Sequence, residues 1–290
     1  MRNVTKDNIT DVFMGYLGEG TDPRLREVMG SLVRHLHAFA RETNLTHAEW
    51  NMGIQFLERA GEISDKERHE FVLLSDVLGL SSLVDMLHNA PEGTSSSVLG
   101  PFHITGSPPL HVGGDLRQDF DAPVLLAEGV VRAPDGSPIP GATLDIWQTA
   151  PNGLYSSQDP DQDTYSFHGL QTVGDDGRYA FTTVRPVEYT VPSDGPVGDI
   201  LRACGRHPWR PSHLHYIVEA EGYKPLVTEV FPEDDPYLDQ DTVFGVREDL
   251  VMRYETRPAG SFPAEGFALS GKVPEDYLAV TFDLTLVPLG

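Results

Sequence analysis

The sequence contains very little cysteine and little positive charge. Cys204 is the single cysteine among 290 residues, so no disulfide can form within the chain and a cysteine-rich zinc site is excluded. Lysine and arginine together number 21, against 44 aspartates and glutamates, which gives a net charge of −23. This acidic balance argues against a nucleic-acid backbone or an anionic membrane surface as the main partner.

Long apolar runs are also lacking. The sequence has no stretch of about 18 apolar residues, which a membrane-spanning helix requires. Its first residues, MRNVTKDNITDVF, lack the basic start and the apolar stretch of a signal peptide. We therefore expect neither a membrane protein nor a secreted one, but a cytoplasmic enzyme.

The first part of the chain has the apolar spacing of helices. We expect helices over residues 23–41 and 46–59, and a third that starts after Ser64 and is interrupted at Gly79. Asp22 before Pro23 is typical of a helix start. The apolar positions of the first helix follow one another at intervals of three and four or are direct neighbours: Leu25, Val28, Met29, Leu32, Val33, Leu36 and Phe39.

The pattern changes after a segment rich in proline and glycine, residues 91–118. From there on, short apolar runs alternate with turn sequences, as in antiparallel sandwiches and barrels. We therefore expect a mainly β protein, with an antiparallel β-sandwich domain over residues 101–290 behind an α-helical domain over residues 1–100. The expected strands are 122–131, 142–147, 179–184, 213–219, 226–231 and 279–287.

The segment Arg210-Pro211-Ser212-His213-Leu214-His215 is the most informative motif. Two histidines at positions i and i+2 of a strand point to the same face, so both rings can bind one metal ion. Such pairs also occur as ordinary polar core or surface residues. Tyr155 and Tyr189 lie in loop-like sequence beyond apparent strands, where a tyrosine alone is more often a packing residue.

The order of these pieces resembles the intradiol ring-cleavage dioxygenases. The resemblance rests on LDIWQTAPNGLYS, RPVEYTVPSDGPVGDIL and GRHPWRPSHLHYIV, and it covers residues 100–253 approximately. It implies one non-haem Fe(III) per subunit, bound by Tyr155, Tyr189, His213 and His215. Phenolate oxygens suit this hard cation and neutralise its charge, while the imidazoles bind as neutral donors.

The resemblance also implies roles in catalysis. Tyr189 leaves the metal and accepts a proton from a catechol-type substrate, which then reacts with O₂. Arg210 matches the active-site arginine of the family and stabilises charge that develops on the substrate. Without the resemblance, an ordinary salt bridge would be the preferred interpretation of Arg210.

The segments VLLSDVLGLSSLVD, VLGPFHITG and DDPYLDQDTVFGV resemble the branch of the family that opens hydroxyquinol (1,2,4-trihydroxybenzene) to 3-hydroxy-cis,cis-muconate, the tautomer of maleylacetate. In this interpretation Asp76 accepts a hydrogen bond from the third hydroxyl; the alternative is a solvated aspartate on a helix surface. Leu99 and Phe102 either line the pocket around the substrate ring or are ordinary core residues. The implied substrate pocket consists of Leu73, Asp76, Val98, Leu99, Gly100, Pro101 and Phe102.

Glu229 departs from the family pattern, because relatives that cleave catechol usually have a glutamine at this position. A carboxylate there would repel an anionic substrate unless it is protonated or paired. It could also bond a third hydroxyl, or point away from the site and leave Thr228 or Val230 facing inward. This residue therefore bears on the substrate and not on the iron chemistry.

Three other functions remain open at this point. They are catechol 1,2-dioxygenase activity, a non-catalytic ligand-binding β-sandwich, and a zinc hydrolase that uses the same two histidines. Colour separates the last two from a dioxygenase, since tyrosinate bound to Fe(III) is red-brown. The resemblance further implies that residues 101–290 are the catalytic domain and residues 1–100 a linker or dimerisation domain. It also implies a homodimer formed through the N-terminal helices, with a phospholipid bound at the helical interface.

Overall fold

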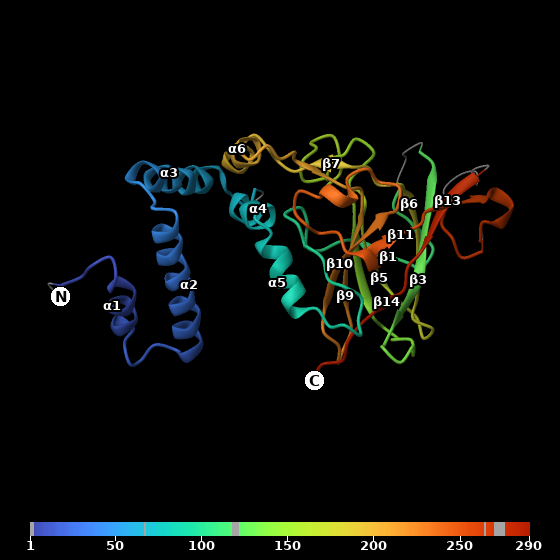
Figure 1. Ribbon diagram of the computed structural model, residues 1–290. Coiled ribbons are helices and arrows are strands. Elements are labelled where there is room, and N and C mark those ends of the chain that lie inside the picture. The colour runs from blue at the N-terminus through green and yellow to red at the C-terminus, as the bar shows by residue number, and fades with distance from the viewer. Residues whose placement is uncertain (1–2, 67, 118–121, 264, 270–275) are drawn as a thin grey trace. The chain divides into compact units, whose positions relative to one another are not determined.

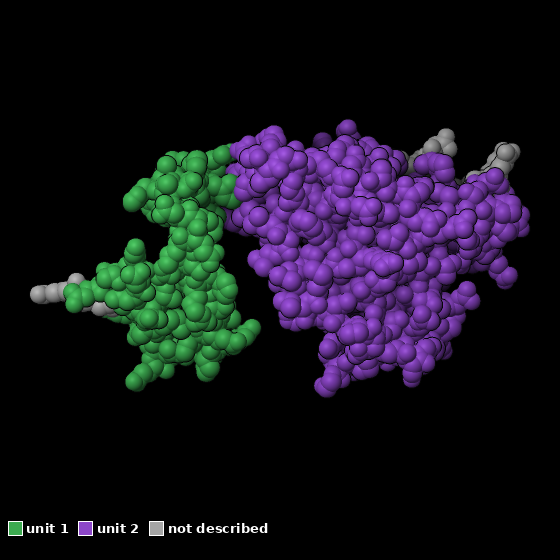
Figure 2. Space-filling model, viewed as in Figure 1, with its two compact units in different colours: residues 1–59 green, residues 60–290 purple. Residues whose placement is uncertain are grey.

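The computed structural model describes residues 3–66, 68–117, 122–263, 265–269 and 276–290. Helices occupy the first part of the chain and strands most of the rest (Figure 1). By its internal contacts the chain divides into two compact units, residues 1–59 and 60–290 (Figure 2). The functional division between residues 1–100 and 101–290 stays a prediction.

The first unit contains α1 (Ile9–Tyr16), α2 (Pro23–Glu42) and most of α3 (His47–Ile63). Asp22 caps α2, since its carboxylate accepts a hydrogen bond from the backbone N–H of Leu25 at 2.9 Å. The predictions of α2 and α3 are confirmed to within a few residues. The helix α1 was not predicted, because its eight residues are too few to show a clear apolar period.

The predicted interruption at Gly79 is confirmed. It separates α4 (Glu70–Val77) from α5 (Leu80–His88), and its φ of 75° is a left-handed conformation that glycine adopts without strain. Among the described residues, no single helix is long and apolar enough to cross a membrane; α4 and α5, bent by 72°, pass that test only as a pair, by length and composition alone.

The second unit contains two large sheets, besides helices and a small two-stranded sheet. One has the strand order β1-β5-β4-β9-β10-β11 and the other β12-β13-β3-β6-β2, with β14 also paired to β3. The strands of the first are β1 (Pro109–Leu110), β4 (Thr143–Trp147), β5 (His168–Thr172), β9 (Leu214–Glu219), β10 (Leu226–Pro232) and β11 (Val251–Met252). Those of the second are β2 (Gly114–Asp115), β3 (Val124–Arg132), β6 (Arg178–Val184), β12 (Glu255–Pro258), β13 (Asp276–Thr281) and β14 (Leu284–Thr285).

The two sheets share one apolar core, as expected of a β-sandwich. Leu144 of β4 and Val218 of β9 lie in it together with Leu125 of β3 and Phe181 of β6, and all four side chains are fully buried. The central pairs β4–β9, β9–β10 and β3–β6 are antiparallel, while strands such as β1, β2 and β11 join in parallel. The sandwich is therefore confirmed, but its sheets are mixed, because β13 also pairs in parallel with β3 inside the second sheet.

The expected last strand, residues 279–287, is broken in two. β13 ends at Thr281 and pairing resumes only at β14. Between them Asp283 accepts a hydrogen bond from the N–H of Val130 at 3.0 Å. The backbone of Phe282 lies so close to Gly129 that a Cβ at that glycine would be 2.0 Å from the Phe282 carbonyl oxygen. This close approach was not visible in the alternating pattern.

Candidate metal centre

Neighbouring strands bring the four residues of the expected ligand set together. His213 lies directly before β9 and His215 within it, opposite Trp147 at the end of β4. The turn after β4 carries Tyr155. Tyr189 begins β7 (Tyr189–Thr190), a short strand that pairs with β8 (Trp209–Arg210), so the chain returns to the histidines immediately afterwards.

Three of these side chains form a tight triangle. The Tyr155 hydroxyl lies 3.3 Å from Nε2 of His213 and 3.1 Å from Nε2 of His215, and the two Nε2 atoms are 3.0 Å apart. Ligands that bind one metal at about 2.0–2.2 Å are separated from each other by such distances. Tyr189 completes the cluster, with its ring 5.4 Å from that of Tyr155 and 5.6 Å from that of His213.

The protonation of this cluster fits a cation. Nδ1 of His213 donates a hydrogen bond to the Pro211 carbonyl oxygen at 2.8 Å, which leaves the lone pair of its Nε2 directed toward the cluster. Burial lowers the pKa of His213 to about 3 and holds the pKa of His215 well below its usual value, so both rings are neutral donors. Two bare nitrogens at 3.0 Å repel each other unless a cation or a proton lies between them.

The tyrosines differ from the histidines in what they need from a metal. Burial raises the pKa of Tyr155 well above its usual value, and the nearby Tyr189 raises it further. Burial also raises the pKa of Tyr189, against the opposing charge of Arg210. Without a cation both phenols stay protonated. A highly charged metal would stabilise the phenolates, as metals do for other bound acids.

Arg210 occupies a buried ion-pair network beside the cluster. Its Nη1 and Nη2 donate to the two carboxylate oxygens of Glu229 at 2.8 and 3.0 Å, and its Nε donates to Asp241 at 3.0 Å. Nη1 also donates to the Tyr189 hydroxyl at 3.4 Å. The two interpretations of Arg210 therefore hold together, since it forms salt bridges and also faces an expected metal ligand.

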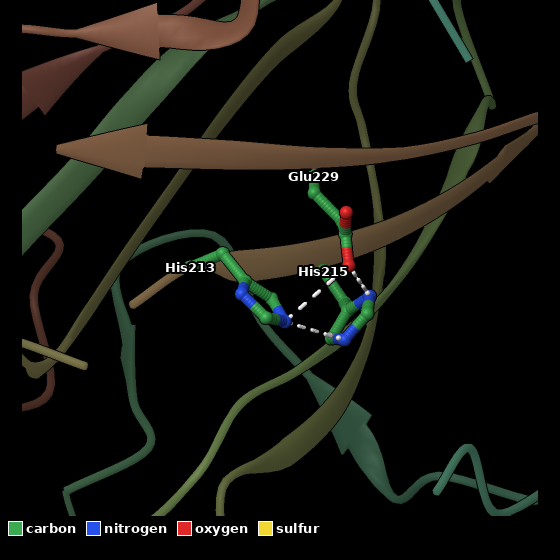
Figure 3. Close-up of side chains that lie close together, drawn as sticks. All are labelled: His213, His215 and Glu229. Atoms are coloured by element: carbon green, nitrogen blue, oxygen red, sulfur yellow. Dashed lines mark hydrogen bonds and ion pairs between the residues drawn. The ribbon is translucent and has the colours of Figure 1, made fainter. Parts of the chain in front are cut away.

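Glu229 points inward, toward the histidines (Figure 3). It is fully buried, and one carboxylate oxygen lies 3.3 Å from Nε2 of His213 and 3.5 Å from Nδ1 of His215. The alternative in which Glu229 points away from the site is wrong; Thr228 instead bonds the Ser95 carbonyl oxygen. Two imidazoles and this carboxylate form a group that could itself hold a metal ion.

Family models match nearly the whole chain. Residues 100–288 match the model described as Dioxygenase, and residues 22–95 match the one described as Catechol dioxygenase N terminus. The chain belongs to the intradiol ring-cleavage dioxygenases. This family depends on non-haem iron, and the donor set of two neutral imidazoles and two phenols suits that metal better than zinc, which takes His, Cys and carboxylates.

Individual relatives agree with this assignment. The chain is 43% identical over 264 residues to a 6-chlorohydroxyquinol 1,2-dioxygenase of Cupriavidus pinatubonensis. This match covers 90% of this chain and 96% of the relative. The chain is 44% identical over 270 residues to a hydroxyquinol 1,2-dioxygenase of Nocardioides simplex, covering 92% and 90% of the two chains.

Solved structures show the same fold. A hydroxyquinol 1,2-dioxygenase of Pseudomonas putida superposes with a TM-score of 0.88 at 42% identity, covering 98% of this chain and 99% of that one. A catechol 1,2-dioxygenase of Acinetobacter superposes with a TM-score of 0.81 at 27% identity, covering 98% and 92%.

In this dioxygenase the predicted pocket residues line two hollows. Leu73, Pro101 and Phe102 line a hollow of about 400 Å³. Asp76 lines a second, of about 600 Å³, to which Pro101 again contributes. The remaining members of the predicted set also line the second hollow: Val98, Leu99 and Gly100. Asp76 is only 3% exposed, so the interpretation as a solvated surface aspartate is wrong.

The segment before β1 places predicted pocket residues against the candidate metal ligands. Phe102 stacks on Tyr155 with ring centres 4.8 Å apart. A Cβ at Gly100 would be 3.8 Å from the His215 ring, and the φ of +71° at this residue favours glycine. Leu99 is 44% exposed and is therefore not a plain core residue.

Sequence reasoning missed several residues around the cluster. Asp241 accepts a hydrogen bond from Arg210, and Ser97 donates one to Glu229. Both come from other segments of the chain. Val191 and Pro192 line the smaller hollow directly after Tyr189. None carries a motif of its own; only their nearness in sequence to Tyr189 could have pointed to Val191 and Pro192. Trp147 stacks on His215, with ring centres 4.4 Å apart.

Proposed function

We propose that this dioxygenase opens hydroxyquinol with O₂ between its two adjacent hydroxylated carbons, giving 3-hydroxy-cis,cis-muconate. The ferric ion is held by Tyr155, Tyr189, His213 and His215, one ion per chain. The observation that carries the proposal is the triangle of Tyr155 and the two Nε2 atoms, with separations of 3.0–3.3 Å. Relatives named as hydroxyquinol dioxygenases support the substrate.

The side chains of the site have different roles in the proposed reaction. Bound Fe(III) supplies a Lewis acid that draws electron density from the two adjacent substrate oxygens and makes the ring reactive toward O₂. Tyr189 would accept a proton from a substrate hydroxyl. Arg210, with Nη1 3.4 Å from the Tyr189 hydroxyl, stands where it stabilises charge on the same oxygen.

Asp76 selects the substrate in this proposal. Its carboxylate lies in the larger hollow and accepts a hydrogen bond from the third hydroxyl of hydroxyquinol. Leu73 and Phe102 line the smaller hollow, which shares Pro101 with the larger one, and supply the apolar walls for the ring. Catechol 1,2-dioxygenase activity is the alternative, and it leaves the buried carboxylate of Asp76 without a partner on the substrate.

A homodimer formed through the N-terminal helices is part of the proposal. One side of α2 repeats apolar residues at intervals of three and four, and each is at least 44% exposed. These residues are Leu25, Val28, Leu32, Leu36 and Phe39. A second copy of the chain would cover this stripe, and a phospholipid with its acyl chains along the stripe would fill the interface.

Oxygen uptake by the iron-loaded protein tests the proposed function, with hydroxyquinol and catechol as substrates and the autoxidation of hydroxyquinol subtracted. Rapid uptake with hydroxyquinol and little with catechol is the expected result. Preference for catechol would keep the iron chemistry and reject the role of Asp76. A colourless protein with confirmed bound iron would reject the tyrosinate ligands.

A further inference from the structure

Glu229 occupies a position that the proposed reaction does not use. It is fully buried, and its carboxylate is set against Nδ1 of His215, at 3.5 Å, while Nε2 of the same ring faces Tyr155. Figure 3 shows the carboxylate on the Nδ1 side of this ring. A ring that binds a metal through Nε2 carries its hydrogen on Nδ1, so this N–H is directed at a negative charge.

One oxygen of Glu229 also lies 3.3 Å from Nε2 of His213, so the carboxylate is near the metal site, but its neighbours hold both of its oxygens by other bonds. Arg210 binds both of its oxygens, at 2.8 and 3.0 Å, and the Ser97 hydroxyl lies 2.6 Å from the second oxygen. To bind a metal, the carboxylate would have to give up the paired hydrogen bonds to Arg210, which is itself 2% exposed. Its effect on a metal therefore passes through the residues that it touches.

We propose that Glu229 is a positioning residue whose fixed charge, set against Nδ1 of His215, strengthens the bond of this histidine to the iron and makes the Fe(III) centre poorer at accepting electrons. The inference rests on the proposed function, since it takes Nε2 of His215 as an iron ligand. At 3.5 Å the Glu229 oxygen and Nδ1 of His215 are in electrostatic contact. A movement of a few tenths of an ångström toward each other completes a hydrogen bond between them.

The charge count around Arg210 supports this role. One guanidinium faces two carboxylates, those of Glu229 and Asp241, so the three groups together carry one negative charge. Arg210 therefore does not cancel the field that Glu229 exerts on His215. Among the described residues Nδ1 of His215 forms no hydrogen bond, and the Glu229 carboxylate at 3.5 Å is the acceptor set against it, while Trp147 stacks on the face of the ring.

The variants Glu229→Gln and Glu229→Asp test the inference in the iron-loaded, full-length protein. The first removes the charge with little change of shape, and the second retains the charge but draws it back by one methylene group. Chelator competition should show that Glu229→Gln binds iron about tenfold or more weakly. Its phenolate-to-iron absorption band should move to longer wavelength, and its Fe(III)/Fe(II) midpoint potential should rise. Glu229→Asp should shift in the same directions by less.

Asp241→Asn is the matched control. It removes a like charge from the other edge of the same guanidinium, and the other hydrogen bonds of Asp241 go to the backbone N–H groups of Val243 and Gly245. We expect a smaller shift of the band and of the potential than in Glu229→Gln. Equal shifts in the two variants, or an unshifted band in both Glu229 variants, would overturn the inference.

Two further outcomes are separable from these. If Glu229→Gln does not fold, as judged by its thermal unfolding, the band of Glu229→Asp decides, and an unchanged band rejects the inference. If the wild-type protein binds iron and is colourless, the proposed function itself fails, and the inference falls with it. A coloured wild-type protein whose variants do not shift rejects the inference alone.

Discussion

Replacing Asp76 by asparagine should separate hydroxyquinol from catechol as substrates. The side chain is 3% exposed and lies in the larger hollow with Val98 and Gly100. A hydrogen bond to a charged acceptor contributes about 1.5–3 kcal/mol, and about 1.4 kcal/mol corresponds to a factor of ten in rate. Asp76→Asn should therefore lower kcat/KM for hydroxyquinol about ten- to hundredfold.

Catechol has no third hydroxyl, so its kcat/KM should change about threefold or less in the same variant, a difference smaller than one hydrogen bond. Initial rates of oxygen uptake, checked against the ultraviolet absorbance of the ring-opened product, measure both substrates. Asp85→Asn serves as the control, because Asp85 lines the same hollow and has the same charge.

Two results would refute the reasoning about Asp76. An equal loss with both substrates would mean that Asp76 supports the fold of the pocket and does not recognise a hydroxyl. Retention of the full preference for hydroxyquinol would mean that other residues recognise the third oxygen. A matching loss in Asp85→Asn would point to the general charge of the hollow.

Three further outcomes follow from buried groups. Glu70 is 1% exposed and accepts a hydrogen bond from the N–H of Val197 at 3.0 Å, so Glu70→Ala should lower the free energy of unfolding by about 1–3 kcal/mol in a denaturant titration; an unchanged midpoint would contradict this. Burial raises the pKa of Asp85 to about 6, above its value near 4 in the unfolded chain. The native state therefore stays protonated to a higher pH than the unfolded chain, and the free energy of unfolding falls as pH rises between these two values. Asp85→Asn should remove this slope and be more stable than wild type at pH 7.5 but not at pH 4, by thermal unfolding. Tyr155→Phe should bind iron more weakly and lose part of the visible band, whereas full colour would exclude Tyr155 as a ligand.

Local patterns were sufficient to predict the longer helices and the strands β3, β4, β6, β9 and β10, but not α1, β5, β12 or most of the two-residue strands. The apolar spacing located α2 and α3, and the left-handed glycine located the break between α4 and α5. The prediction of one continuous last strand was wrong because the interruption depends on Gly129, a residue 153 positions before Phe282 (282 − 129) that lets the backbone of Phe282 approach. Such a contact between distant segments leaves no trace in the alternation of a single strand.

In the candidate site, too, some features could be predicted from local sequence and others depend on contacts between distant segments. His213 and His215 are two residues apart, and their shared direction follows from the strand alone. The direction of Glu229 could not be predicted, because Arg210 and Ser97, which hold it, come from other segments of the chain. Long-range ion pairs set the electrostatics of this site, and no local rule reports them.

The short ribbon of β7 and β8 has a consequence for how this enzyme can change over evolution. It places Tyr189 opposite Arg210 through backbone pairing, so their relative position does not depend on the path of the chain between them. That path includes α6 (Pro196–Ala203) as well as Val191 and Pro192, which line the smaller hollow. Substitutions or insertions there can reshape the smaller hollow for new ring substituents while Tyr189 and Arg210 remain in register.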